Sequence, residues 1–250
     1  MDDYQLLIDL HKDGERQGPG GNKELKMMLD LAMVDRNAPL KIADIGCGTG
    51  ASTLQLANLL KAQITAVDFL QDFLEVLETN AEKMALSENI NTLCCSMEKL
   101  PFADEEYDII WSEGAIYNIG FERGVSEWNR YLKPGGLLVV SEITWTTKTR
   151  PPQLQKYWQE AYPEIDTASA KIAILENCGY SPVGYFTLAE HCWLENYYRP
   201  IQDRLGAFLE NHKHSADAQA IANAEIQEIE LYEKFKSHYS YGVYISRKLS

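Results

Sequence analysis

The chain has 250 residues, of which 45% are hydrophobic and 24% are charged, values typical of one soluble globular domain. Its formal net charge of −14 at pH 7 excludes a broad nucleic-acid-binding surface, because such surfaces need Lys and Arg to neutralise phosphates. No apolar run approaches the roughly 20 residues of a membrane helix, so we expect a small-molecule partner, no nucleic acid and no membrane span.

The N-terminal part, residues 1–38, is expected to be helical, with a helix over 23–34 capped by Asn22. The polar, glycine-rich stretch "HKDGERQGPGG" precedes that helix. Its glycines suit a hinge, so we expect a lid from which Arg16 and Gln17 reach a bound ligand. A surface loop joining two helices is the alternative.

Residues 39–145 alternate short apolar runs with helix-like stretches. Strands are expected at 40–45, 62–68, 90–95, 107–112 and 136–143, and helices at 50–60, 71–84 and 121–132. Apolar strands separated by helices indicate a parallel sheet covered on both faces, and right-handed crossovers make it a doubly wound α/β sheet. This part is the expected ligand-binding core.

Residues 146–250 form the second half of the same domain. Helices are expected at 152–161, 167–177, 189–211 and 216–237, and strands at 179–188 and 239–249. The sequence has no repeat, low-complexity tract or linker. We therefore predict a single domain over residues 1–250.

A glycine-rich elbow, "KIADIGCGTGASTLQLA", leads from the first strand into a helix. Gly46 and Gly48 allow a ligand to lie against bare backbone, and the helix that begins near Gly50 directs free N–H groups at it. Asp68 ends the second strand about 20 residues further on, where an acid accepts hydrogen bonds from both hydroxyls of a ribose. The elbow therefore predicts a ligand that contains a nucleoside.

The type of ligand is ambiguous at this point. "GCGTGA" also satisfies the GxGxxA pattern of dinucleotide-binding proteins, so an NAD-type oxidoreductase is an alternative. Asp44, two residues before the first glycine, would repel a pyrophosphate and attract an ammonium or a sulfonium. That carboxylate favours the second kind of ligand.

Four motifs in order, "ADIGCGTG", "AVDFLQDFLEVLETNA", "SMEKLPFADEEYDIIWS" and "LKPGGLLVVSE", resemble those of class I S-adenosylmethionine-dependent methyltransferases. The nearest branch acts on small molecules and includes the quinone-biosynthesis C-methyltransferases. The resemblance covers about residues 40–145. It implies a Rossmann-like, doubly wound, seven-stranded, mostly parallel sheet with an antiparallel last strand, a helical N-terminal lid and a helical insertion before that strand. It also implies the cofactor S-adenosyl-L-methionine, the product S-adenosyl-L-homocysteine and, in many relatives, a homodimer.

The resemblance also assigns roles to residues. Gly46 and Gly48 would let the amino-acid half of the cofactor pass over the elbow, and Asp68 would hold its ribose. Phe69 would pack against the adenine, and Met97 would offer its backbone N–H to the adenine ring.

Four more residues complete the implied cofactor site. Ser96 replaces the acid that usually accepts from the adenine amino group, so this contact loses charge assistance. The backbone carbonyl of Ser112 would accept from the cofactor ammonium, near Asp44, and Arg16 would reach the cofactor carboxylate.

Methyl transfer requires alignment of nucleophile, methyl and sulfur, and a base only if the acceptor must lose a proton. Glu113 and Tyr117 would border the place where cofactor and acceptor meet and are the candidate catalytic residues. The alternative is that Glu113 caps a helix and Tyr117 packs. His191 is a second candidate base, and Trp145 together with Tyr117 suggests an aromatic acceptor.

No metal site is expected. The five cysteines, Cys47, Cys94, Cys95, Cys178 and Cys192, have no CxxC spacing and are typical of reduced thiols in a cytoplasmic protein. His212 and His214 are expected in a solvated turn. A protein that binds the cofactor without transferring a methyl group is the remaining alternative.

Overall fold

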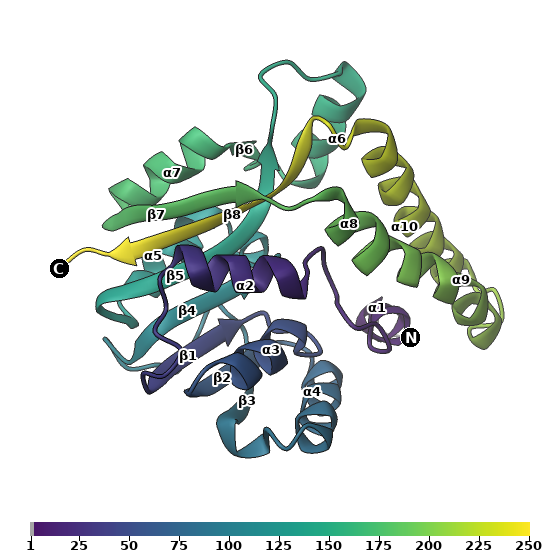
Figure 1. Cartoon of the computed structure of the whole chain (residues 1–250). Helices are drawn as coiled ribbons and strands as arrows, with labels where there is room; N and C mark the ends of the chain where they lie inside the picture. Colours follow the sequence, from purple (N-terminus) through teal and green to yellow (C-terminus); the bar gives the residue numbers. More distant parts are fainter. Residues whose placement is uncertain (1–2) are drawn as a thin grey trace.

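The computed structural model describes residues 3–250. Figure 1 shows one twisted sheet, with α2 and α3 in front of it and α5 behind it. The strands follow the order β3-β2-β1-β4-β5-β8-β7, and β6 pairs with β5 outside this path. The predicted doubly wound α/β fold is confirmed. Within residues 3–250, no helix has the length and apolar character needed to cross a membrane.

The sheet is mostly parallel. Its strands are β1 (Leu40–Ile45), β2 (Ala62–Asp68), β3 (Ile90–Cys94), β4 (Tyr107–Glu113), β5 (Leu132–Trp145), β6 (Asp166–Thr167), β7 (Tyr180–Thr187) and β8 (Tyr239–Lys248). The last strand, β8, runs antiparallel to both neighbours, β5 and β7, as predicted. The two-residue β6 is an eighth strand that the sequence analysis did not include, because so short a pairing has no pattern of its own.

Helices cover the two faces of the sheet and bury separate cores. The helices of the first part of the chain are α1 (Asp3–His11), α2 (Asn22–Leu31), α3 (Ala51–Leu59), α4 (Gln71–Lys83), α5 (Phe121–Asn129), α6 (Pro152–Ala161) and α7 (Ala168–Asn177), with the 3-10 turns η1 (Ser87–Asn89) and η2 (Ile116–Asn118). Successive strand residues point to opposite faces, so Trp111 joins the core under α2 and α3, and Ile110 joins the core under α5 and α7. Apolar residues on both faces explain why β4 reads as a nearly continuous apolar run.

The N-terminus of α2 differs from the prediction. Asn22 is the first helical residue, and Gly21 occupies the N-cap position without a side-chain cap. The predicted capping role of Asn22 is therefore wrong.

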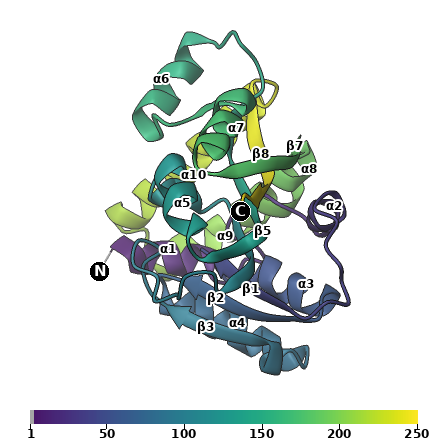
Figure 2. The ribbon, with the colours of Figure 1, turned by 90° about the vertical axis from the view of Figure 1, so that its left-hand side faces the viewer.

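The predicted helix over 189–211 is interrupted by a wider turn. It consists of α8 (Glu190–Trp193), the π-helical segment η3 (Leu194–Tyr198) and α9 (Arg199–Asn211), and α10 (Ala216–Phe235) follows. Pro200 has no N–H to donate to the carbonyl four residues earlier, which accounts for the irregular turn before it. Figures 1 and 2 both place α1 beside α9 and α10.

The start of α3 depends on Gly50, whose φ is 86°. A Cβ there would lie 2.2 Å from Cδ1 of buried Leu77, whereas Gly135, with φ 76°, has open space around it. Alanine at either position carries backbone strain of about 1–2 kcal/mol, and at Gly50 it adds overpacking of about 1–3 kcal/mol. We expect Gly50→Ala to lower the free energy of unfolding in urea by at least about 1 kcal/mol more than Gly135→Ala. Equal losses would contradict this account of the elbow.

Candidate functional site

A cavity of about 470 Å³ opens at the carboxyl ends of β1, β2 and β4. The chain order of the strands reverses between β1 and β4, and open α/β sheets bind ligands at such a switch point. Its lining includes nine of the predicted site residues: Arg16, Asp44, Gly46, Gly48, Asp68, Phe69, Met97, Glu113 and Tyr117. The fold therefore brings together residues from five separate stretches of the sequence.

Two predicted residues, Ser96 and Ser112, lie outside this lining. The hydroxyl oxygen of Ser96 accepts a hydrogen bond of 3.3 Å from the N–H of Glu98 and closes a local turn. The Ser112 hydroxyl donates to the carbonyl of Ile45 at 2.8 Å, between β4 and β1. A contact between Ser96 and an adenine would require its side chain to leave that turn, and both roles stay predictions.

Asp68 faces the cavity and ties the glycine elbow to the turn after β2. One carboxylate oxygen accepts from the N–H of Gly48 at 2.8 Å, and the other accepts from the N–H of Leu70 at 3.0 Å. Each oxygen retains a lone pair for a second donor. The carboxylate is therefore placed to accept two hydroxyl groups of a ligand. Burial raises its pKa, and the backbone N–H groups of Leu70, Gly48 and Phe69 oppose that shift.

Asp44 is a buried acid at the floor of the cavity. Its side chain accepts a hydrogen bond of 2.6 Å from the Thr53 hydroxyl, and the residue is 2% exposed. Burial raises the pKa of this carboxyl to about 7, and the charges of Glu113 and Asp68 act in the same direction. A ligand cation here would favour the ionised form.

The raised pKa of Asp44 makes stability depend on pH. Between about pH 4 and pH 7 the folded protein holds a proton that the unfolded chain has lost, so this contribution to stability decreases as pH rises. In this pH range the free energy of unfolding should fall by up to about 1.4 kcal/mol per pH unit because of Asp44, and we expect Asp44→Asn to remove that decrease. Urea unfolding of the wild-type protein and of Asp44→Asn at several pH values measures this slope. If the free energies of unfolding of the two proteins changed in parallel with pH, the expectation would be refuted.

Arg16 and Glu113 form a buried ion pair across the cavity. Nη2 of Arg16 lies 2.9 Å from Oε2 of Glu113, and both side chains are 8% exposed. The other carboxylate oxygen accepts from the hydroxyl of Ser52 at 2.7 Å and from the indole N–H of Trp111 at 2.8 Å. In the structure Glu113 thus anchors Arg16, and its candidate role as a base stays a prediction.

The glycine-rich segment 11–21 lies on the elbow, as predicted for a lid. Oε1 of Gln17 accepts from the backbone N–H and the hydroxyl of Thr49, at 2.8 and 2.9 Å. The amide nitrogen of Gln17 donates to the carbonyls of His11 and Gly14. Gln17 therefore both shapes the segment and fastens it to the start of α3.

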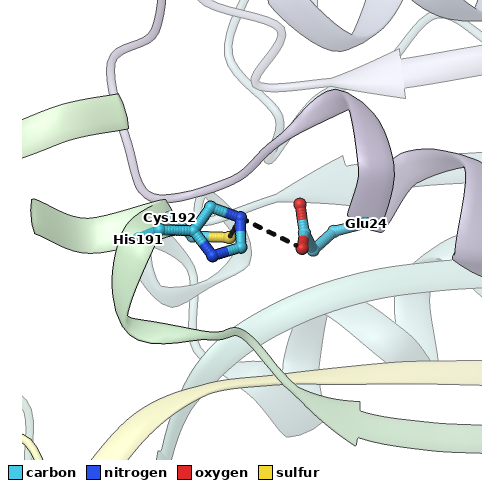
Figure 3. A group of neighbouring side chains, drawn as sticks. All are labelled: Glu24, His191 and Cys192. Carbon is cyan, nitrogen blue, oxygen red and sulfur yellow. Dashed lines mark hydrogen bonds and ion pairs between the residues drawn. The ribbon is translucent and has the colours of Figure 1, made fainter. Parts of the chain in front are cut away.

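Behind segment 11–21, the side chain of Glu24 in α2 lies next to those of His191 and Cys192 in α8. Figure 3 shows the His191 ring beside both partners: its Nε2 is 3.3 Å from a Glu24 oxygen and 3.7 Å from the Cys192 sulfur. Burial raises the pKa of the Cys192 thiol to about 12, so this thiol is protonated at neutral pH. His191, the second candidate base, lies outside the cavity lining and pairs with Glu24 instead.

Glu225 and Glu228, which lie in another wall of the cavity, were not predicted. This wall is formed by His11, Tyr197, Glu225 and Glu228, together with Tyr117. The spacing of Glu225 and Glu228 places them on one face of α10, but charged residues on a long helix usually face solvent. Only the packing of α10 against α1 and α9 turns this face inward.

Trp145 does not lie where the sequence analysis expected it. It is buried in the same large core as Trp111 and packs edge-to-face against Tyr239. It is outside the cavity lining, so its suggested contribution to an acceptor pocket is wrong.

Comparison with known proteins agrees with this geometry. Residues 43–140 match the family described as "Methyltransferase domain". A demethylmenaquinone methyltransferase of Staphylococcus aureus (strain MRSA252) is 32% identical over 111 residues, which cover 43% of this chain and 45% of that protein. The chain spans about half the length of the curated relatives it matches.

Solved structures resemble nearly the whole chain. An S-adenosylmethionine-dependent methyltransferase from Geobacter sulfurreducens, in complex with S-adenosyl-L-homocysteine, gives a TM-score of 0.85 at 15% identity and covers 98% of both chains. The cyclase SpnF gives a TM-score of 0.78 at 19% identity, over 98% of this chain and 92% of its own. These likenesses show the fold.

Proposed function

We propose that this protein is an S-adenosylmethionine-dependent methyltransferase of small molecules, because residues 43–140 match the methyltransferase-domain family and nearly the whole chain resembles the fold of a solved methyltransferase. The observation that carries the proposal is the Asp68 carboxylate, which faces the cavity beside the glycine elbow with a lone pair free on each oxygen. The similarity to a demethylmenaquinone methyltransferase and to the Geobacter sulfurreducens methyltransferase supports the same activity.

The residues present fit this cofactor. The elbow backbone is bare because it has no room for side chains: a Cβ on Gly46 would lie 2.3 Å from Cβ of Ala115, and one on Gly48 would lie 2.5 Å from Oε1 of Gln17. Asp68 would hold the ribose, Phe69 would cover the adenine, and Arg16 would meet the carboxylate. When bound, S-adenosylmethionine supplies a methyl group already activated on a sulfonium, without a metal.

The chain's own residues would then align the acceptor and exclude water. The segment 11–21 covers the elbow, and the Arg16–Glu113 pair holds that segment across the cavity. Methyl transfer by in-line displacement gains chiefly from such alignment.

We also propose a cytoplasmic location and a homodimer. The five cysteines are free in the structure, as is usual in a reducing compartment. Light scattering after gel filtration tests the dimer, and a mass of one chain would contradict it.

Calorimetric titration with S-adenosyl-L-homocysteine and with NADH tests the ligand. We expect binding of the first and none of the second; the reverse result would favour the oxidoreductase. Transfer of labelled methyl to any acceptor in a cell extract then separates an enzyme from a protein that only binds the cofactor. This second step is needed because a cyclase shares the fold.

A further inference from the structure

We propose that the methyl acceptor carries a protonated amine, which Glu225 and Glu228 bind at the wall formed by α10. The inference rests on the proposed function and names the class of acceptor for the same cavity. Three observations support it: the negative charge of the cavity lining, a buried carboxylate oxygen of Glu225 without a partner among residues 3–250, and the aromatic side chains beside it.

The cavity has an excess of negative charge. Its lining contains five carboxylates, on Asp44, Asp68, Glu113, Glu225 and Glu228, whereas its basic side chains are those of Arg16 and His11. The nearest carboxylate to the Arg16 guanidinium is that of Glu113, so this charge is already paired. An anionic acceptor would therefore meet repulsion across most of the lining.

Glu225 and Glu228 of α10 lie at this wall, and Glu225 is incompletely satisfied. Oε1 of Glu225 lies 3.2 Å from Nε2 of His11, but Oε2 is buried without a hydrogen-bond partner among residues 3–250. Oε1 of Glu228 accepts from the Tyr198 hydroxyl at 2.9 Å. Burial and the neighbouring Glu225 raise the pKa of Glu228, and the Tyr198 hydroxyl and His11 oppose that shift. Burying such groups is costly unless a cation or donor reaches them.

Aromatic rings stand beside these carboxylates. Tyr197, from the π-helical turn η3, and Tyr117, from η2, line the same cavity, and the charges of Glu228 act on both phenols. Cations bind favourably over the faces of aromatic rings, and more so in a desolvated site. A neutral aromatic acceptor would stack on the tyrosines but would leave Oε2 of Glu225 without a partner. A protonated amine satisfies both kinds of group.

A pair of probes of nearly equal shape tests the inference without knowledge of the acceptor. Benzylamine is cationic at pH 7, and benzyl alcohol is neutral. In saturation-transfer NMR on the protein loaded with S-adenosyl-L-homocysteine, we expect benzylamine to bind at least tenfold more tightly. Glu225→Gln and Glu228→Gln should each remove most of this preference, and Glu230→Gln, on an exposed position of α10, should keep it. Equal binding of the two probes by the wild-type protein would overturn the inference.

The same samples distinguish the two proposals. Calorimetry with S-adenosyl-L-homocysteine shows whether each variant is folded and binds the cofactor product. Failure of the wild-type protein to bind it contradicts the proposed function. Tight binding of it, without any preference for the ammonium probe, contradicts the amine proposal alone.

A metabolite extract gives the second measurement. The extract is separated by cation exchange at about pH 2, where carboxylates are largely protonated and compounds with an amine are retained. Both fractions are returned to pH 7 and incubated with enzyme and methyl-labelled cofactor. We expect labelled product from the retained, cationic fraction, reduced at least tenfold by Glu228→Gln. Label that forms only from the unretained fraction would overturn the proposal.

Discussion

Replacement of Asp68 by alanine should weaken binding of S-adenosyl-L-homocysteine at least tenfold. Both oxygens of this carboxylate face the cavity side of the elbow and have capacity for a ligand hydroxyl. A hydrogen bond to a charged group contributes about 1.5–3 kcal/mol, and about 1.4 kcal/mol corresponds to tenfold in affinity. Isothermal titration calorimetry measures the loss directly.

Asp68 also holds the N–H groups of Gly48 and Leu70, so its removal disturbs the elbow as well as the ligand contact. Asp68→Asn separates the two effects, because the amide keeps one acceptor oxygen but loses the charge. We expect it to bind with an affinity between those of the wild-type and Asp68→Ala. Asp104→Ala, at an exposed position, is the matched control and should bind normally. Unchanged affinity in Asp68→Ala would refute the ribose role.

The sequence contained enough information for the core of the fold because its signals are local. Each strand of the parallel half is a short apolar run, and the elbow, Asp68 and the closing β8 follow from composition over a few residues. Gly46, Gly48 and Asp68 meet because one βαβ unit places the elbow beside the end of the next strand. Such proximity is fixed by the crossover and needs no knowledge of the rest of the chain.

The acceptor side could not be predicted because its contacts join distant parts of the chain. Glu228 faces a cavity only after α10 has packed against α1, and His11 reaches Glu225 from the other end of the sequence. Trp145 is the last residue of β5, which leads toward the site, yet its side chain belongs to the core. His191 was a candidate base from its place in the sequence, but in the structure its ring pairs with Glu24. Local patterns do not specify which face of a helix or strand another element will cover.

The lid should depend on the Arg16–Glu113 pair more than on any other contact of segment 11–21. Arg16→Met removes the cation and leaves a carboxylate that is 8% exposed with only the donors Ser52 and Trp111. Breaking a buried pair from one side typically costs about 3–5 kcal/mol, so we expect a loss approaching that size in the free energy of unfolding. If segment 11–21 opened in Arg16→Met, water would solvate Glu113 and the loss in the free energy of unfolding would be smaller. Trypsin would then cut the open segment faster at Lys12.

The double variant Arg16→Met, Glu113→Gln distinguishes a charge effect from a loss of packing. Without the negative charge no ion remains buried, so we expect the double variant to recover at least half of the lost stability and its resistance to trypsin. Affinity for S-adenosyl-L-homocysteine should not recover, because the guanidinium proposed to meet the ligand carboxylate is still missing. A double variant that is no more stable than Arg16→Met would show that the pair is not coupled. One that binds the ligand as tightly as the wild-type protein would show that Arg16 closes the lid without touching the ligand.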